Sequence, residues 1–259
     1  MKLLPILLLA AIIIVAGCSQ KAPPPGNIPP LTVQQDKGLA PVNLVFINDS
    51  SCGKCQNLNG VLDSLKKENV NLDTVLLVQY NSTSGEKLVN QYKVKHVPAV
   101  LISYSITKYP LIGQKFMNAG VPPGGFYLLQ SPPVYKEIAT GKIRGLANLT
   151  FIQDETCGQC FKLAPMKTAL GQLGFRAQTE KIVNLSSAEG QKLIKHYNIT
   201  KVPTVLLTGD LEVYENLNAS WTDVGTVESD GTYVLRDMNP LGPGVVYKDL
   251  STSQTVNQS

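Results

Sequence analysis

The sequence predicts an α/β protein built from two consecutive copies of one structural unit. Three observations lead to this prediction. When the chain of 259 residues is shifted by 157 − 52 = 105 positions, it matches itself without a gap from residue 43 to residue 107. The same order of strand-like and helix-like patterns recurs in both copies. Each copy also carries one Cys-x-x-Cys, and the apolar content of 43% is enough for a packed core.

Each copy is expected to contain a strand, the Cys-x-x-Cys, a helix, a strand, a helix and a strand that opens with proline. Short apolar runs rich in β-forming residues predict the strands, and apolar residues at helical spacing predict the helices. In the first copy the expected elements are 43–48, 58–65, 72–80, 84–92 and 97–102. In the second copy they are 148–153, 163–173, 177–185, 189–197 and 202–207.

A further stretch follows each expected core, at 108–137 and at 213–250, and both are rich in glycine, proline and short β-like runs. The repeat reappears there, because Val134-Tyr135-Lys136 is echoed by Val246-Tyr247-Lys248. We therefore expect a β-rich extension at the C-terminal end of each copy.

The two cysteine pairs, Cys52/Cys55 and Cys157/Cys160, indicate reversible dithiol–disulfide chemistry. A thiol at the start of a helix lies over unsatisfied backbone N–H groups, which favour the thiolate. Three residues further on, a second sulfur is close enough to bond with it or to attack. The first cysteine of each pair is expected to be the exposed nucleophile, and the second the shielded resolving thiol.

The residues around these pairs resemble the thioredoxin superfamily over about 65 residues of each copy. CGKC and CGQC each follow a strand, and a Val-Pro before an apolar strand comes 98 − 55 = 203 − 160 = 43 residues after the second cysteine. The resemblance implies two tandem thioredoxin-like domains, each a central mixed sheet with flanking helices. It also implies cis prolines that face the dithiol and contact bound peptide, which makes Pro98, Pro203, Val97 and Val202 the expected substrate-binding residues.

The sequence departs from that family in two places. Ser51 and Thr156 stand where a tryptophan precedes the first cysteine, and Phe46 and Phe151 replace a buried, proton-shuttling aspartate. Pro165 does match the helix-kinking proline of the family, and the first copy has glycine there.

Three cations are candidates for lowering a thiol pKa. His96 and its counterpart Lys201 lie two residues before the predicted cis prolines, and Lys54 lies between the first pair of cysteines. A positive charge near the dithiol would favour the thiolate. All three could equally be solvated surface charges.

The N-terminus is interpreted as a targeting segment. An apolar stretch of about 14 residues is too short to span a bilayer and suits a signal peptide. It ends in Val15-Ala16-Gly17-Cys18, which resembles the lipobox of prokaryotic lipoproteins, with Cys18 as the lipidated residue. An uncleaved apolar anchor is the alternative. In both cases the protein is expected to be extracytoplasmic and anchored to the cell membrane.

Two features fit export. A proline-rich segment after Cys18 is expected to be a semi-rigid spacer. Seven Asn-x-Ser/Thr triplets suggest a glycosylated surface; they begin at Asn48, Asn81, Asn148, Asn184, Asn198, Asn218 and Asn257. The expected domains are a signal peptide at 1–18, a linker at 19–31, and thioredoxin-like domains at 32–140 and 141–259.

We therefore predict a membrane-tethered thiol–disulfide oxidoreductase, a reductase or isomerase, that acts on protein thiols and disulfides of exported proteins with an unknown redox partner. One alternative is a scaffold or binding module with structural disulfides. The other is a metal-handling protein, although 157 − 55 − 1 = 101 residues between the pairs far exceed the spacing of a zinc site. The net charge of +4, without a Lys/Arg run, argues against nucleic-acid binding. No metal and no cofactor is expected.

Overall fold

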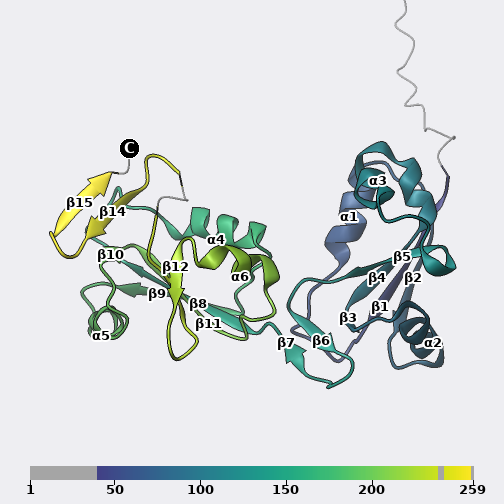
Figure 1. The fold of residues 1–259 in the computed structure, drawn as a ribbon, viewed down its shortest axis with the longest axis horizontal. Coiled ribbons are helices and arrows are strands. Elements are labelled where there is room, and N and C mark those ends of the chain that lie inside the picture. The colour runs from purple at the N-terminus through teal and green to yellow at the C-terminus, as the bar shows by residue number, and fades with distance from the viewer. Residues whose placement is uncertain (1–39, 239–241, 258–259) are drawn as a thin grey trace, which may run out of the picture. The chain divides into compact units, whose positions relative to one another are not determined.

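The computed structural model describes residues 40–238 and 242–257, and the predicted repeat is a repeat of structure (Figure 1). The core of the first repeat contains β1 (Val42–Asn48), α1 (Asn59–Lys67), β2 (Leu72–Gln79), α2 (Thr83–Tyr92), β3 (His96–Val97) and β4 (Ala99–Ser103). The core of the second contains β8 (Ala147–Gln153), α4 (Leu163–Gln172), β9 (Thr179–Asn184), α5 (Ala188–His196), β10 (Lys201–Val202) and β11 (Thr204–Gly209). Each expected core strand and helix is present, with the proline strand divided in two at its proline.

The extensions contain a helix as well as strands, so their predicted β-rich character is only partly confirmed. The first has the 3₁₀ turns η1 (Tyr104–Lys108) and η2 (Pro123–Gly125), α3 (Pro110–Met117), β5 (Phe126–Gln130), β6 (Tyr135–Glu137) and β7 (Ile143–Arg144). The second has α6 (Glu215–Trp221), β12 (Gly225–Val227), β13 (Tyr233–Leu235), β14 (Val246–Asp249) and β15 (Gln254–Asn257). Helices α3 and α6 begin 215 − 110 = 105 residues apart, so the repeat continues into them. Pro110 suits the first helical position, where no N–H is needed.

The main sheet of each repeat is mixed, as the resemblance implied. In the first repeat β1 runs parallel to β2 and antiparallel to β4, and the strand order is β2-β1-β4-β5. In the second repeat β8 pairs with β9 and β11 in the same senses, in the order β12-β13-β11-β8-β9. The registers agree residue by residue, because Leu44 lies beside Val75 and its counterpart Leu149 lies beside Glu180.

Helices cover both faces of each main sheet, because alternate side chains along a strand point to opposite faces. In the first repeat, Leu44 and Ile102 pack with Leu65 of α1 and Phe116 of α3. On the other face, Ile47 packs in a separate core that includes side chains of α2. The second repeat has the same two cores, one with α4 and α6 and the other with α5. This arrangement leaves the loop between the first strand and the first helix at one end of the sheet.

Each repeat also has a small sheet that joins the extension to the core. Strand β6 pairs antiparallel with β3, and its counterpart β14 pairs antiparallel with β10. A third strand completes each sheet, β7 in the first repeat and β15 in the second. The last part of each extension therefore lies against the short strand that comes just before Pro98 or Pro203.

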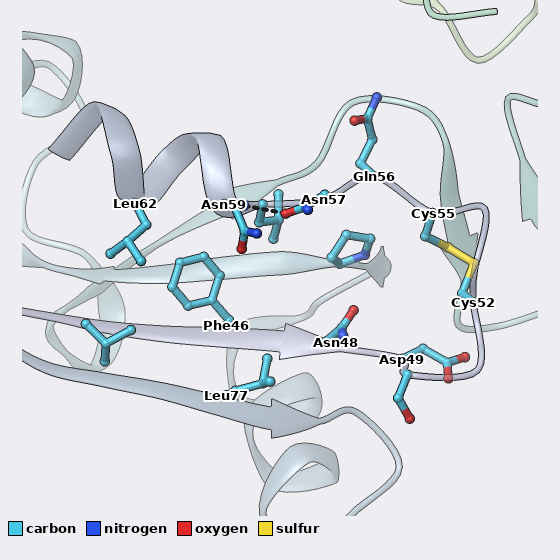
Figure 2. A pocket seen from close by; sticks show the side chains of 14 residues that line it. Phe46, Asn48, Asp49, Cys52, Cys55, Gln56, Asn57, Asn59, Leu62 and Leu77 are labelled. Carbon is cyan, nitrogen blue, oxygen red and sulfur yellow. Dashed lines mark hydrogen bonds between the residues drawn. A yellow bond between two sulfur atoms is a disulfide. The ribbon is translucent and has the colours of Figure 1, made fainter. Parts of the chain in front are cut away.

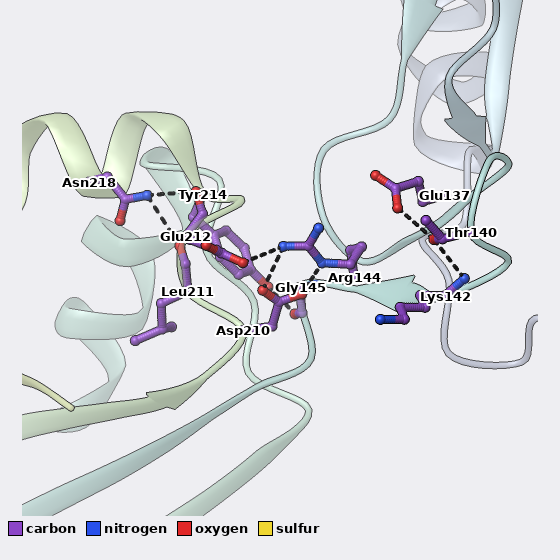
Figure 3. A network of polar contacts seen from close by, with 10 residues as sticks. All are labelled: Glu137, Thr140, Lys142, Arg144, Gly145, Asp210, Leu211, Glu212, Tyr214 and Asn218. Carbon is purple, nitrogen blue, oxygen red and sulfur yellow. Dashed lines mark hydrogen bonds and ion pairs between the residues drawn. The ribbon is translucent and has the colours of Figure 1, made fainter. Parts of the chain in front are cut away.

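The connection between the repeats is held by a polar network (Figure 3). Arg144 Nε and Nη2 donate to the two carboxylate oxygens of Asp210 at 2.7 and 3.1 Å, and Nη2 also contacts Glu212 at 2.7 Å. The buried hydroxyl of Tyr214 donates to the carbonyl of Gly145 at 2.6 Å. A bidentate arginine–carboxylate contact is geometrically specific, so it fixes the chain just before β8 begins.

Two equivalent glycines are required by close backbone contact. A Cβ on Gly85 of α2 would overlap the carbonyl oxygen of Gln79, and one on Gly190 of α5 would overlap that of Asn184. We expect Gly85→Ala to destabilise the protein by about 1–3 kcal/mol, the usual cost of overpacking. Gly171→Ala is the matched control, because its Cβ meets nothing within 4 Å in α4, and it should be neutral or stabilising. Urea denaturation of both variants tests this; equal midpoints would contradict it.

Candidate active site

Both cysteine pairs are disulfides, Cys52–Cys55 and Cys157–Cys160. They lie in the loops that follow β1 and β8, and α1 and α4 begin only at Asn59 and Leu163. The expectation that each pair opens a helix is therefore wrong. Its cause is a long-range hydrogen bond: the N–H of Gln56, directly after the first pair, donates to the carbonyl of Val134 at 2.7 Å. That N–H is then not used to continue a helical turn from Cys52.

The two disulfides differ in exposure. Cys52 and Cys55 are both partly exposed, whereas Cys157 is 9% and Cys160 4% exposed. The expected contrast between an exposed first and a shielded second cysteine is therefore wrong for Cys55, which is partly exposed like Cys52, and for Cys157, which is buried with its partner. The first disulfide is therefore the more exposed of the two.

The peptide bonds before Pro98 and Pro203 are cis, as the resemblance implied. Pro98 lines the same pocket as Cys52 and Cys55. Val97 and Val202 are fully buried, and their positions are paired with Lys136 of β6 and Lys248 of β14. The side chains of these two valines therefore pack inside the protein, although β3 and β10 are edge strands of their small sheets, and the role of the valines in substrate binding stays a prediction.

One short segment of the extension contacts the chain on both sides of the first disulfide. We call Val134-Tyr135-Lys136 the clamp strand of the first repeat. Its first residue accepts the hydrogen bond from Gln56 after the disulfide, and its last donates from Nζ to Asp49 Oδ2 at 2.6 Å before the disulfide. Between them, the ring of Tyr135 stacks on His96 with centroids 3.8 Å apart. The clamp strand thus fixes the chain on both sides of Cys52–Cys55 and the strand before Pro98.

The second repeat has the same clamp strand in Val246-Tyr247-Lys248. The N–H of Phe161 donates to the carbonyl of Val246 at 2.8 Å, and Lys248 Nζ donates to Asp154 Oδ2 at 2.6 Å. Lys201 Nζ lies 5.1 Å from the ring centroid of Tyr247, where the first repeat has His96 on Tyr135. Three independent contacts recur, so the clamp is a property of the repeat.

Asp49 and Asp154 organise the loop before each disulfide. Asp49 Oδ1 accepts the N–H and the hydroxyl of Ser51, at 2.9 and 2.6 Å, and its backbone carbonyl accepts the N–H of Cys52 at 3.1 Å. Asp154 makes the same contacts with Thr156 and Cys157. The hydroxyl residues that replace the tryptophan of the family therefore have a structural role, which tryptophan could not fulfil.

Each of these carboxylates is held in its charged form. Burial would raise the pKa of Asp49, but hydrogen bonds from Lys136 and Ser51 outweigh it and the pKa is lowered. The hydrogen bond from Lys248 is the main cause of the lowered pKa of Asp154. The side chains of both aspartates are 7% exposed. Each disulfide therefore has a shielded ion pair next to it in the sequence.

The three cations predicted to tune a thiol pKa have different surroundings. Burial lowers the pKa of His96, whose Nε2 lies 3.0 Å from the carbonyl of Ser131. The lowered pKa disfavours the positive charge expected at this position, and the effect of His96 on a thiol stays a prediction. Lys201 lies over Tyr247, and Lys54 is exposed; their effect on a thiol stays a prediction.

Sequence reasoning missed the residues that form the ion pairs. Asp49 and Asp154 lie three residues before the first cysteine of each pair, 105 positions apart. Lys136 and Lys248 end the two clamp strands, whose echo was visible in the sequence. Charged residues that recur at the same place in both copies were therefore a usable signal. Pro165 lies in the first turn of α4, where an N–H is not needed, so it does not kink the helix.

A pocket of about 470 Å³ adjoins the first disulfide (Figure 2). Its polar end holds Cys52, Cys55 and Asp49, and its other end is apolar. There, Leu62 of α1 and Leu77 of β2 lie on either side of the Phe46 ring. A group bonded to a sulfur at Cys52 would share one pocket with this apolar end.

The fold and the paired disulfides define a tandem α/β protein with two Cys-x-x-Cys sites, each with its own cis-proline. The thioredoxin family model matches residues 36–110, so the first repeat is thioredoxin-like. The second repeat has the same strand order around its disulfide and cis-proline, and is thioredoxin-like. The comparison with curated proteins gave no match.

Among solved structures, the chain is similar to a protein disulfide oxidoreductase from Aeropyrum pernix, with 14% identity, 67% of this chain and 79% of that chain covered, and a TM-score of 0.22. It is also similar to a mutant of the alkylhydroperoxide reductase protein AhpF from Enterococcus faecalis, with 16% identity, 69% of this chain and 89% of that chain covered, and a TM-score of 0.19.

Cys18, the expected signal peptide and linker, and residues 32–39 of the expected first domain lie outside the described residues. Within 40–238 and 242–257, none of the helices is long and apolar enough to cross a membrane. In the same part of the chain, no group of three or more His, Cys, Asp or Glu side chains could hold a metal ion.

Proposed function

We propose that this protein is a membrane-tethered, extracytoplasmic thiol–disulfide oxidoreductase, a reductase or isomerase of protein disulfides. The observation that carries the proposal is the partly exposed disulfide Cys52–Cys55, which shares a pocket with cis-Pro98. A thiolate at this position is accessible to a substrate disulfide, and the second sulfur is near enough to resolve the product.

The reaction is a two-step exchange. The thiolate of reduced Cys52 attacks one sulfur of a substrate disulfide, the substrate S–S bond breaks, and a mixed disulfide forms while the other substrate sulfur leaves as a thiolate. The thiolate of Cys55 then attacks Cys52, which releases the second substrate thiol and leaves Cys52–Cys55 oxidised. Two electrons pass to the substrate, and the leaving thiolates take up protons from solvent.

The location is proposed from the sequence. The apolar leader that ends at Cys18 would place a lipid anchor at the N-terminus, and disulfides persist outside the cytoplasm. The substrates would then be exported proteins with thiols or disulfides. In the variant Cys18→Ala, we expect either that the protein is found in the soluble fraction or that it accumulates as the uncleaved precursor. If mature protein is still found in the membrane fraction in the same amount, Cys18 is not the lipidated residue.

A redox titration tests the activity. The full-length protein in detergent is equilibrated in dithiothreitol buffers of graded potential, and each pair is read by thiol alkylation and peptide mapping. We expect Cys52–Cys55 to titrate above about −300 mV, the limit typical of structural disulfides. If both pairs resist reduction to lower potentials, both disulfides are structural and the protein is a scaffold. The buried pair Cys157–Cys160 is expected to be the harder of the two to reduce.

A further inference from the structure

The two redox sites have different surroundings, although their scaffolds match. Phe46 of β1 and its counterpart at 46 + 105 = 151 occupy the same register in the two sheets. Phe46 is partly exposed and lines the pocket beside the first disulfide. Phe151 is 0% exposed. The space that is open beside the first disulfide is therefore closed at the same position of the second repeat.

Two substitutions within the repeat also change the chemistry between the first helix and the edge strand. Leu62 and Val75 line the first pocket, and the residues 105 positions later are Lys167 and Glu180. In the second repeat these two form an ion pair, with Lys167 Nζ 2.7 Å from a Glu180 carboxylate oxygen. An aliphatic pair is thus replaced by a charged pair that bridges the first helix and the edge strand. Charged side chains there would not favour an apolar ligand.

The apolar wall of the first pocket reaches the surface. Leu77 is 69% and Val75 45% exposed, in an edge strand that neighbours only β1 in its sheet. Both residues line the same pocket as the two sulfurs. A chain that is bonded to Cys52 through its own cysteine therefore enters the pocket whose other end is lined by Phe46, Leu62 and Leu77.

We propose, on the basis of the function proposed above, that the two redox sites differ in substrate selectivity. The first site selects protein or peptide disulfides whose cysteine is flanked by large apolar residues, and the pocket between α1 and β2 holds one such side chain. The second site makes no such selection. Because burial of one aliphatic or aromatic side chain is favourable, kcat/KM of the first site should be roughly tenfold or more higher for an apolar substrate than for a polar one.

Two disulfide-linked model peptides of equal length and charge provide the probe, one with leucine and phenylalanine next to the cysteines and one with serine and glutamine. The fully reduced, full-length protein is mixed with each peptide or with oxidised glutathione, quenched with an alkylating reagent and mapped. We expect Cys52–Cys55 to be oxidised roughly tenfold faster by the apolar peptide than by the polar one. The Cys157–Cys160 pair should react at similar rates with both.

The double variant Leu62→Lys/Val75→Glu introduces the ion pair of the second repeat into the first. It should remove the preference, so that the apolar and the polar peptide oxidise Cys52–Cys55 at similar rates. Leu77→Ser, at a mostly exposed position that is easily tolerated, should reduce the preference in the same direction. The control Leu111→Lys/Val121→Glu adds the same charges at exposed apolar positions outside the pocket and should retain the preference.

Each outcome decides a different point. If the first pair reacts with both peptides equally, or if the pocket variants retain the preference, the inference is overturned while the oxidoreductase function stands. If the reduced pair exchanges with neither the peptides nor glutathione, the proposed function fails, and the inference fails with it.

Discussion

Replacement of Cys52 by serine is expected to lower the rate of disulfide exchange with a protein substrate to the slower rate of the second dithiol. The reason is that a hydroxyl cannot form the mixed disulfide, and the second dithiol is buried: Cys157 is 9% exposed where Cys52 is partly open. Cys157→Ser should retain most of the wild-type rate. The measurement is the loss of a substrate disulfide after stoichiometric addition of the reduced protein.

Two controls make this result interpretable. The midpoint of thermal unfolding shows whether each variant is folded, and Cys55→Ser should accumulate the mixed disulfide at Cys52, which peptide mapping detects. If Cys52→Ser retains the wild-type rate and Cys157→Ser loses it, the second site is the substrate site, and the exposure of the oxidised form does not identify the reactive pair.

The second large effect is expected when the ion pair between Lys136 and Asp49 is broken, and it concerns the reactivity of the Cys52 thiol. Lys136→Met leaves the shielded carboxylate of Asp49 without its partner, and a lone negative charge opposes a thiolate nearby. Asp49→Asn leaves the ammonium of Lys136 instead, which favours the thiolate. Reduced Cys52 should therefore be alkylated roughly severalfold more slowly than wild type in the first variant and faster in the second, at a pH below the thiol pKa.

A merely structural role predicts the same direction for both variants, so opposite directions identify an electrostatic role. Lys248→Met is the matched control, because it removes the equivalent lysine of the second repeat and should leave the alkylation of Cys52 unchanged. The double variant Asp49→Asn/Lys136→Met should lie near wild type, because neither charge remains uncompensated.

The same pair gives a pH dependence with a definite sign. The pKa of Asp49 is lowered in the folded protein, so folding favours the ionised carboxylate. That contribution to stability is complete above the ordinary carboxyl pKa and is lost as the pH falls through the lowered value. Urea midpoints of wild type and Lys136→Met should therefore differ more at pH 7 than at pH 3. A gap that widens on acidification would contradict this account.

The two cores could be predicted from the sequence because their pattern is local and repeated. Apolar alternation and helical spacing identified the elements, and the constant shift of 105 residues assigned them to two equivalent units. Helix α3 was missed because it is short and lies among glycine and proline, and α6 was missed because it has only seven residues. Their apolar residues, such as Phe116 and Trp221, are buried in the cores of the two repeats, and this burial depends on contacts with other elements.

The details of the site depend on non-local contacts, and sequence reasoning failed there. The loop conformation of Cys52–Cys55 follows from a hydrogen bond between Gln56 and Val134, which are 134 − 56 = 78 residues apart. Ser51 seemed a loss relative to the family's tryptophan, yet its hydroxyl binds Asp49. The burial of Phe151 but not Phe46 depends on side chains from separate elements. The Gln56–Val134 contact and the burial of Phe151 are not visible in a window of neighbouring residues, whereas Ser51 and Asp49 are only two positions apart.

The clamp strand also sets the order in which a newly synthesised chain can complete its sites. Asp49 and Lys136 are 87 residues apart, and Asp154 and Lys248 are 94 apart. A growing chain therefore presents both cysteines of a pair long before the lysine that closes their loop has been made, and such distant pairings form slowly. A chain that stops before residue 134 keeps its first Cys-x-x-Cys but lacks the strand that holds it. Each site thus becomes complete only when translation of its own repeat is nearly finished.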